Sequence, residues 1–471
     1  MKLMLLISEI SIVLLAALLM AADLLLPRTA SRRSLGYAAA GGVLAVFIFS
    51  FTQYGPAATV YQGLFVVDNF SVFFKQLFLM ATLLTLLFSV DYVEGLGSRR
   101  GEFYALLLLA LAGMMVMASS NDLVTVFVGL ELMTIVFYIL SGFNFNSIKS
   151  SEAGMKYMLL GAASSAVFVY GVSWVYGFTG SVALQQISAK AADSPAVLLG
   201  IALMLAGLCF KLAVTPFHMW APDVYEGAPT PITAILAMGS KAASLAILLR
   251  IFLVAFAGLQ SYWLPVTGAL AAFSMVGGTI VAMRQTNIKR MMGYSSVAQA
   301  GYMLVGLMAA DAAGVKGMLF YAMLYVFANV GVFAVVVAVS RQSGAEDIAD
   351  FSGLAQQAPF LALTMTAALL SMAGIPPMAG FVGKFYIFMA IMEQGYWGMA
   401  ALGFVMSMVS VYYYLLVVRT MYVTVPGGRQ PLVVSRSLQL AALVSFSMTL
   451  LIGIYPAPLA SLSNIAAQAL W

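Results

Sequence analysis

Four ionisable residues stand inside long apolar runs of this sequence, where they could transfer protons. They are Glu131, Lys211, Lys241 and Lys384. Placing an unpaired charge at the centre of a bilayer costs about 2.5–3.5 kcal/mol on insertion scales, so such residues normally face a protein interior or a hydrated cavity. Residues of this kind mark ion and proton pathways. The four side chains therefore predict a proton or cation conductor.

Glu131 is the acidic member of this set. It lies mid-way along NDLVTVFVGLELMTIVFYIL, and its natural partners are Lys211 and Lys241. It either forms a structural ion pair that locks two helices or relays protons. Burial disfavours the protonated form of a lysine, whereas a nearby carboxylate favours it. A change in the distance between Glu131 and Lys211 would therefore switch the proton affinity of Lys211, which is a way to gate protons by conformation.

The other two lysines differ in their surroundings. Lys241 lies about a dozen residues into its apolar run, too deep to snorkel, and its small neighbours leave room for water or close helix packing. Lys384 follows a proline break, and a lysine beside re-entrant backbone can border a hydrated cavity, so we predict a terminal relay site. Arg250 lies nearer the end of its run, and snorkelling to the surface is predicted for it.

His218 is the only histidine, two residues beyond Pro216. An unperturbed imidazole titrates near pH 6.5, which suits proton transfer, but a buried imidazole with one hydrogen bond is the alternative. One histidine cannot make a typical metal site. A solvated or capping role is expected for Asp223 and Glu226. Structural roles are expected for three ionisable residues near the ends of apolar runs: Glu9, Asp23 and Lys75.

The composition is that of a membrane protein. Of 471 residues, 63% are hydrophobic and 8% are charged, against roughly 25% charged in a soluble domain. Apolar runs of about 20 residues suit membrane helices. The single cysteine, Cys209, excludes an internal disulfide and cysteine-ligated clusters, which need several thiolates. The net charge of +5 does not indicate a nucleic-acid partner, because the basic residues lie in short loops.

The apolar runs predict fourteen membrane spans, the first of which is read as a retained span rather than a cleaved signal. They cover residues 3–26, 34–53, 70–91, 102–118, 121–140, 152–177, 196–217, 229–256, 260–283, 288–309, 313–340, 359–393, 396–423 and 435–457.

The basic residues of the loops predict the orientation, because cytoplasmic loops are rich in lysine and arginine. One set of alternate loops holds Arg28, Arg32, Arg33, Arg99, Arg100, Lys149, Lys156, Arg284, Lys289, Arg290, Arg341, Arg419, Arg429 and Arg436. The other set holds only Lys2, Lys190 and Lys316. This separation supports the count of spans and places both termini on the outer side.

Two of the predicted spans contain prolines that should break them. The seventh reads FKLAVTPFHMWAPDVYEGAPTP, and the twelfth reads GIPPMAGFVGKF. Proline removes a backbone donor and clashes with the preceding turn. Inside a membrane, such breaks persist only where protein or a water-filled cavity satisfies the freed backbone groups.

The two broken spans predict the domain organisation. Paired broken helices in corresponding positions indicate a transporter built from inverted repeats, and their separation of five spans gives the two repeats opposite orientations. We predict an all-α polytopic fold with 14 transmembrane helices and two inverted five-helix repeats, each with a broken helix. Residues 102–257 and 258–430 form the repeats, preceded by helices 1–3 in residues 1–101 and followed by residues 431–471 with helix 14.

Several motifs together resemble the antiporter-like membrane subunits of respiratory complex I. They are NDLVTVFVGLELMTIVFYIL, FKLAVTPFHMWAPDVYEGAPTP followed by SKAA, NIKRMMGYSSVAQAGY and GIPPMAGFVGKFYIF. The match runs through both predicted repeats. The short chain, the absence of a long lateral helix and the lysine after GIPP favour the subunit N branch of bacterial NADH:quinone oxidoreductase.

This resemblance implies roles for the candidate residues. Glu131, Lys211, Lys241 and Lys384 match the ionisable residues of the fifth, seventh, eighth and twelfth helices, which form a hydrophilic axis between two half-channels. His218 matches the histidine of the broken seventh helix. The family implies a proton-translocating part of an enzyme whose flavin, iron–sulfur clusters and quinone belong to partner subunits. It also implies a place in the membrane arm, within the bacterial cytoplasmic (inner) membrane and beside other membrane-arm subunits.

Two other functions fit the same residues. A subunit of a multi-subunit sodium/proton antiporter shares this fold and these lysines, and a related membrane arm could serve a hydrogenase or another electron donor. Only the twelfth helix separates the redox-driven proton pump from the sodium/proton antiporter, and it does so through resemblance. A purely structural membrane protein would leave four deeply placed ionisable residues without an explanation.

Overall fold

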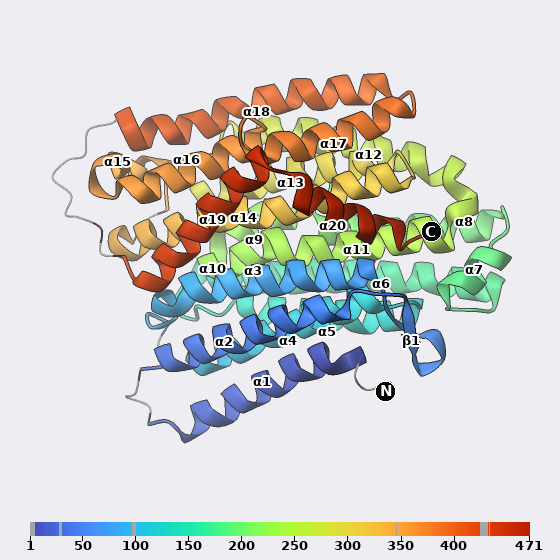
Figure 1. Ribbon diagram of the computed structural model, residues 1–471, viewed down its shortest axis with the longest axis horizontal. Coiled ribbons are helices and arrows are strands. Elements are labelled where there is room, and N and C mark those ends of the chain that lie inside the picture. The colour runs from blue at the N-terminus through green and yellow to red at the C-terminus, as the bar shows by residue number, and fades with distance from the viewer. Residues whose placement is uncertain (1–4, 28–30, 97–99, 345, 424–431, 433) are drawn as a thin grey trace.

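The computed structural model describes residues 5–27, 31–96, 100–344, 346–423, 432 and 434–471, and these are almost entirely helical (Figure 1). The helices are α1 Ile7–Leu25, α2 Arg33–Ser50, α3 Asn69–Val93, α4 Arg100–Ser119, α5 Leu123–Ser141, α6 Ile148–Thr179, α7 Leu184–Lys190, α8 Pro195–Leu212, α9 Trp220–Gly227, α10 Thr230–Ile235, α11 Lys241–Arg250, α12 Gln260–Ala282, α13 Ile288–Leu307, α14 Ala312–Ser343, α15 Leu354–Gln357, α16 Pro359–Ala373, α17 Ala379–Glu393, α18 Trp397–Val423, α19 Arg436–Ile454 and α20 Ala457–Gln468. One antiparallel hairpin pairs β1 Ala58–Val60 with β2 Phe65–Val67.

Twelve described helices are long and apolar enough to cross a membrane. They coincide with twelve of the predicted spans. The predicted span 288–309 is the helix α13, and the predicted span 359–393 is divided into α16 and α17 of 15 residues each. The all-helical polytopic fold is therefore confirmed, whereas the count of fourteen spans stays a prediction. The short helices α7 and α20 and the β-hairpin were not predicted.

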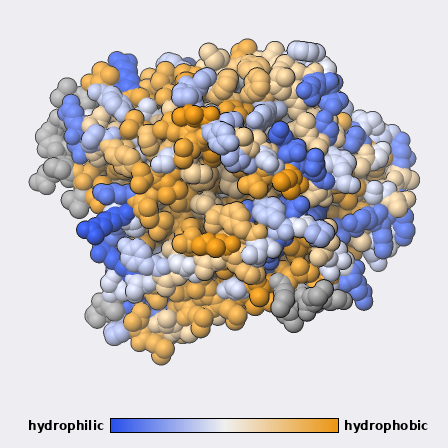
Figure 2. Space-filling view, in the orientation of Figure 1, coloured by the Kyte–Doolittle hydropathy of each residue, from blue (hydrophilic) through white to orange (hydrophobic). Residues whose placement is uncertain are grey.

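The surface agrees with a membrane-spanning bundle. The long helices run side by side, and α1 begins and α20 ends at the same edge of the bundle (Figure 1). Figure 2 shows mostly apolar surface across the middle of one face, with hydrophilic residues gathered toward its left and right edges. Because lipid tails replace water around such a band, backbone groups must be satisfied within helices.

The core of the bundle is formed by two helical stretches. In an apolar stretch of 18 residues within α14, 94% of the residues are buried. In the corresponding stretch of Thr230–Ala255, all residues are buried. The stretch Thr230–Ala255 is not a regular α-helix. A π-helical turn at Leu236–Ser240 separates α10 from α11, and a second follows at Ile251–Ala255. Such turns are frequent at functional sites, and Lys241 directly follows the first one.

Both predicted breaks are present and have the same backbone pattern. The helix α8 ends before Ala213, and α16 ends before Gly374; both of these residues are in the left-handed region. In each case the next amide reaches back to a carbonyl in the last turn, from Val214 to Cys209 and from Ile375 to Leu370, at 2.9 and 3.1 Å. This is the cap that ends helices with a left-handed residue.

The two breaks also have equivalent neighbours. The long helix α6 packs against both halves of the first broken helix, α8 and α9. The long helix α14 packs against both halves of the second, α16 and α17. This correspondence is what an internal repeat requires, but the limits of the predicted repeats stay predictions. The limit at 430, together with Lys2, Arg28, Arg99 and Arg429, lies outside the described residues.

One buried ion pair joins two of the N-terminal helices, and a second ties these helices to the rest of the bundle. Lys75 of α3 pairs with Glu9 of α1 at 2.7 Å, in agreement with the structural role predicted for both. The prediction that Arg250 snorkels was wrong. Arg250 is 5% exposed, and its guanidinium donates two hydrogen bonds to Asp68, at 3.0 and 3.1 Å. Asp68 lies 182 residues away in sequence, so no local pattern could reveal this partner.

Candidate proton-conducting site

Three of the predicted site residues are buried lysines without an acidic partner. Lys211, Lys241 and Lys384 are 2%, 2% and 3% exposed. The ion pairs of the described residues include none of the three. Burying an ammonium group costs several kcal/mol unless other groups compensate for the lost water. The compensating groups are neutral oxygens and aromatic rings.

Lys211 lies in the last turn of α8. Its Nζ donates to Tyr138 Oη at 3.3 Å, Ser165 Oγ at 3.2 Å and the carbonyl of Gly161 at 3.5 Å. Gly161 faces the hydroxyl end of Tyr138, and a Cβ at this position would overlap that side chain. A glycine is therefore needed for α5 and α6 to bring these oxygens together around Lys211.

Glu131 lies on the same face of α5 as Tyr138, which binds Lys211. The helix α5 begins where the Asp122 carboxylate caps the amides of Val124 and Thr125 at 2.9 Å. Glu131 and Tyr138 are seven residues apart, which places them on one face, about 10 Å apart along the helix axis. Glu131 is half-buried, and its Oε1 has no hydrogen-bond partner among the described residues.

The predicted ion pairs of Glu131 with Lys211 and Lys241 are not formed in the part of the chain that the structure describes. The structure brings Glu131 to the side of α5 that faces Lys211, with Tyr138 bonded to that lysine. In this arrangement Tyr138, and not Glu131, is bonded to Lys211 among the described residues. A closer approach of Glu131 would strengthen the hold of Lys211 on its proton.

Lys241 is held by α13. Its Nζ donates to the carbonyl and the hydroxyl of Ser296 at 2.8 and 2.7 Å. The Nζ also lies 5.8 Å from the ring centroid of Tyr225. The π-helical turn before Lys241 inserts an additional residue into the helix, which changes the direction in which the following side chains point.

Lys384 is held by the second break. Its Nζ donates to the carbonyls of Met372 and Ala373 at 2.9 and 3.3 Å and to Ser407 Oγ at 2.8 Å. Met372 and Ala373 end α16, and the last carbonyls of a helix lack partners within the helix and carry partial negative charge. The Nζ also lies 4.2 Å from the ring centroid of Tyr302, a favourable cation–π distance. The break thus supplies the groups that stabilise this cation.

Polar residues of α13 lie between Lys241 and Lys384. Gln299 Nε2 donates to Met372 O, the carbonyl that also binds Lys384, at 3.1 Å. The same amide donates to Tyr414 Oη at 3.1 Å, and Tyr414 is hydrogen-bonded to Ser295. Ser295 precedes Ser296, which binds Lys241. A nearly continuous run of buried polar groups therefore connects the two lysines.

Aromatic rings fill the space between Lys211 and Lys241. The rings follow in the order Tyr138, Tyr157, Trp220 and Tyr225, and the centroids of successive rings are 4.9, 4.5 and 6.3 Å apart. The first of these tyrosines binds Lys211, and the last lies beside Lys241. All four rings are buried. This part of the path lacks the run of hydrogen bonds seen on the other side of Lys241.

The sequence did not identify the polar and aromatic groups around the lysines. Ser296, Gln299 and Tyr414 carry no signal of their own, since serine and tyrosine are common in membrane helices. The available signal was the grouping of Ser295, Ser296 and Gln299 within one apolar span. Three polar residues within five positions of a membrane helix indicate an inward-facing polar face.

His218 lies between α8 and α9 and is half-buried. Its ring centroid is 6.3 Å from that of Tyr294, and its Nδ1 is buried without a hydrogen-bond partner among the described residues. It is hydrogen-bonded to none of the three lysines. A role for His218 in the relay therefore stays a prediction.

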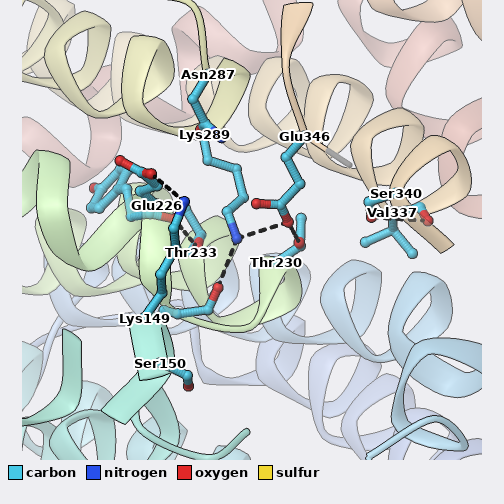
Figure 3. A network of polar contacts seen from close by, with 12 residues as sticks. Lys149, Ser150, Glu226, Thr230, Thr233, Asn287, Lys289, Val337, Ser340 and Glu346 are labelled. Atoms are coloured by element: carbon cyan, nitrogen blue, oxygen red, sulfur yellow. Dashed lines mark hydrogen bonds and ion pairs between the residues drawn. The ribbon is translucent and has the colours of Figure 1, made fainter. Parts of the chain in front are cut away.

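Asp223 and Glu226 form a half-buried ionic cluster, and the solvated or capping role predicted for them was wrong. Asp223 pairs with Lys156 and Arg290 at 2.7 Å, and Glu226 pairs with Lys149 at 2.9 Å and Arg290 at 3.1 Å. The cluster ties α9 to α6 and α13 (Figure 3 shows its Lys149 and Glu226).

The ionic cluster keeps both carboxylates charged. Burial opposes the ionisation of Asp223, but hydrogen bonds from Lys156 and Arg290 outweigh it and hold the pKa of Asp223 below its ordinary value. Burial likewise opposes ionisation of Glu226, and hydrogen bonds from Lys149 and Arg290 hold the pKa of Glu226 below its ordinary value. These carboxylates therefore act as fixed negative charges near neutral pH.

A metal site is not formed by the described residues, since no three of their His, Cys, Asp or Glu side chains are placed to hold an ion. The chemistry that the site supports is proton transfer. Its ionisable groups are buried amines and one half-buried carboxylate, and their neighbours are hydroxyls and carbonyls.

Comparison with known proteins places the chain in a family. Residues 120–410 match the family model described as NADH:quinone oxidoreductase/Mrp antiporter, TM. The chain is 52% identical to NADH-quinone oxidoreductase subunit N of Heliobacterium modesticaldum over 99% of each chain. A chain of respiratory complex I from Thermus thermophilus superposes with a TM-score of 0.83 at 31% identity, over 96% of this chain and 98% of that one.

A chain of the Mrp complex from a Dietzia species superposes with a TM-score of 0.84 at 25% identity, over 98% of this chain and 97% of that one. The backbone alone therefore fits both kinds of assembly, whereas sequence identity is twice as high with the subunit N relative. The chain belongs to the NADH:quinone oxidoreductase/Mrp antiporter transmembrane family, and within it to the NADH-quinone oxidoreductase subunit N family.

Proposed function

We propose that this chain is the proton-translocating membrane-arm subunit of an NADH:quinone oxidoreductase, and that Glu131, Lys211, Lys241 and Lys384 carry the protons. The observation behind this assignment is the burial of three lysines within helical spans, none of which is ion-paired with a carboxylate in the part of the chain that the structure describes. Such lysines are costly, and a purely structural role would not explain three of them. His218 is the further candidate of the set.

In this proposal, each lysine is a proton site whose affinity depends on neighbouring dipoles. A lysine held by neutral oxygens releases its proton when those oxygens move away, and Lys211 retains its proton when Glu131 moves closer. Moving one charge through 100 mV costs about 2.3 kcal/mol. A two-unit change in proton affinity, at about 1.4 kcal/mol per unit, is of the same size. Small helix movements would therefore suffice in magnitude.

The finer organisation belongs to the same proposal. We infer fourteen spans in two inverted repeats, each with a broken helix, with both termini on the outer side of the bacterial cytoplasmic membrane. Flavin, iron–sulfur clusters and quinone would bind to partner subunits, and the chain would lie beside other membrane-arm subunits. The paired breaks with equivalent caps support the repeats, and the start of α1 and the end of α20 lying toward the same side of the bundle support an even number of spans (Figure 1).

The proposal predicts that Lys211→Ala and Glu131→Ala each lower proton pumping and the coupled reduction of quinone. Each substitution removes a proton site, and because Lys211→Ala also removes three buried hydrogen bonds, pumping must be compared per assembled complex. The measurement is NADH-driven acidification of inverted membrane vesicles, normalised to the amount of assembled complex.

The matched control is Lys190→Ala, because Lys190 is an exposed lysine at the end of α7. It should pump like the unmodified chain. Wild-type pumping by assembled Lys211→Ala and Glu131→Ala complexes would show that the relay assignment is wrong.

A further inference from the structure

Lys289 is a buried lysine that the relay described above does not use. It lies in the first turn of α13, and it is 3% exposed. Its Nζ binds Glu346 Oε1 and the carbonyl of Ala228, both at 2.9 Å (Figure 3). The Glu346 side chain is 23% exposed. One end of this pair is therefore buried, and the other end reaches the surface.

Glu346 is held in place by the starts of two helices, α10 and α13. Its Oε1 accepts a hydrogen bond from Thr230 Oγ1, at the start of α10, at 3.2 Å. Its backbone carbonyl accepts from the amide of Ile288 at 2.9 Å, where α13 begins. The pair thus lies where α10 and α13 both start. Continuing along the chain, α10 leads to Lys241, and α13 leads to Ser296, which binds Lys241.

Lys289 and Ser296 lie on the same face of α13. They are seven residues apart, which is two helical turns, or about 10 Å along the axis. Ser296 is 1% exposed, and it binds Lys241 Nζ through its hydroxyl and its carbonyl. The path from the surface to Lys241 along this face therefore passes one partly exposed carboxylate and one buried amine.

Charged groups from every neighbouring element face Lys289. Besides Glu346, they are Lys149 of α6, Glu226 of α9 and Arg290 of α13 itself. Lys149, Glu226 and Arg290 are joined in the ionic cluster (Lys149 and Glu226 are labelled in Figure 3). Glu346 is thus the carboxylate bonded to Lys289, and its side chain is 23% exposed.

We propose that Glu346 and Lys289 form an uptake pair that takes protons from the inner solution and delivers them to Lys241. This rests on the proposed function of Lys241. The Lys289 ammonium releases a proton to water on this face of α13, and that water passes a proton to the neutral amine of Lys241. Glu346 then takes a proton from solution and passes it to the Lys289 amine. Each cycle restores both members of the pair, and no electron is transferred.

The substitution Lys289→Arg separates this role from a structural one. A guanidinium keeps the positive charge and the hydrogen bonds to Glu346, but it cannot release a proton in a protein. We expect the assembled complex with Lys289→Arg to pump at least about fivefold more slowly at about pH 8, with a smaller loss at about pH 6, because slow uptake matters more when protons are scarce.

The matched control is Lys75→Arg. Lys75 is likewise a buried lysine in a glutamate pair, with Glu9 at 2.7 Å, but it lies in the N-terminal helices away from the relay. It should assemble and pump at the wild-type rate at both pH values. The measurement is NADH-driven proton uptake into inverted membrane vesicles. In these vesicles the cytoplasmic side of the membrane faces the medium.

The outcomes distinguish this proposal from the proposed function. If Lys289→Arg pumps at the wild-type rate at both pH values while Lys241→Met does not pump, the uptake pair is wrong and the relay stands. If Lys241→Met also pumps normally, the proposed function itself fails. Should Lys289→Arg not assemble, Glu346→Gln gives the same test, and wild-type pumping by this variant at both pH values overturns the proposal.

Discussion

At the scale of single residues, the site stabilises positive charge with dipoles instead of carboxylates. Lys384 binds two terminal carbonyls of α16, and Lys241 binds both oxygens of Ser296. A carboxylate partner would hold a proton tightly in a low-dielectric interior, because the ion pair is strong there. Neutral oxygens stabilise a cation less, and they can move with their helices. This arrangement suits groups that must release protons repeatedly.

The ionic cluster allows a prediction about pH. The pKa of Asp223 is held below its ordinary value, so its ion pairs stabilise the fold fully above about pH 4. That contribution is lost as the pH falls through the lowered pKa. We expect Asp223→Asn to reduce the thermal stability of the complex at neutral pH, with a difference that shrinks to zero in strong acid.

The measurement is thermal unfolding of detergent-solubilised complex at a series of pH values, with Asp193→Asn as the control. Asp193 is an exposed carboxylate that precedes α8, away from the cluster. A stability difference for Asp223→Asn that persists unchanged into strong acid would contradict the account, because the carboxylate becomes protonated once the pH falls through its lowered pKa.

At the scale of elements, the breaks and the close helix contacts position the lysines. The contact of α5 with α6 depends on Gly161, which leaves room for the Tyr138 hydroxyl beside Lys211. The break after α16 exposes the carbonyls that bind Lys384. Each lysine is therefore linked to an irregular or closely packed piece of backbone, so its surroundings change when helices shift.

The glycine in α6 carries a prediction at this scale. Gly161→Ala should displace Tyr138 from Lys211 and lower proton pumping, because the added Cβ would overlap the tyrosine hydroxyl end. The control is Gly177→Ala in the same helix, where a Cβ meets nothing within 4 Å. The control should pump normally and be unchanged or more stable, since alanine favours helices by roughly 0.5–1 kcal/mol over glycine. Pumping is measured per assembled complex, and equal pumping by both variants would contradict this account of Tyr138.

The elements that sequence predicted best were those with a strong local cause. The apolar runs and the prolines predicted the long helices and both breaks, because each follows from the chemistry of a short stretch. The π-helical turn before Lys241 and the short helix α20 were missed, since neither has a distinctive local pattern. The partner of Arg250 was missed because it comes from a distant helix.

At the scale of the whole molecule, the resemblance to the antiporter-like subunits of complex I is confirmed by a relative at 52% identity over nearly the full chain. The positions of Lys211, Lys241 and Lys384 deep in apolar runs were sufficient to predict buried amines. Their partners were not predictable, because Tyr138, Ser296 and Ser407 come from other helices and are selected by packing. Glu131 was expected to pair with a lysine, whereas among the described residues Tyr138 of the same helix binds Lys211.

The three lysines and their polar neighbours extend through both halves of the bundle, so the central claim is one of proton transfer through the protein interior. The most direct test is the rate of NADH-driven proton pumping by purified complex reconstituted into lipid vesicles with Lys384→Met, compared with Lys190→Met. The account predicts that Lys384→Met assembles but pumps at least about tenfold more slowly, while Lys190→Met pumps normally. Equal rates for the two variants would contradict it.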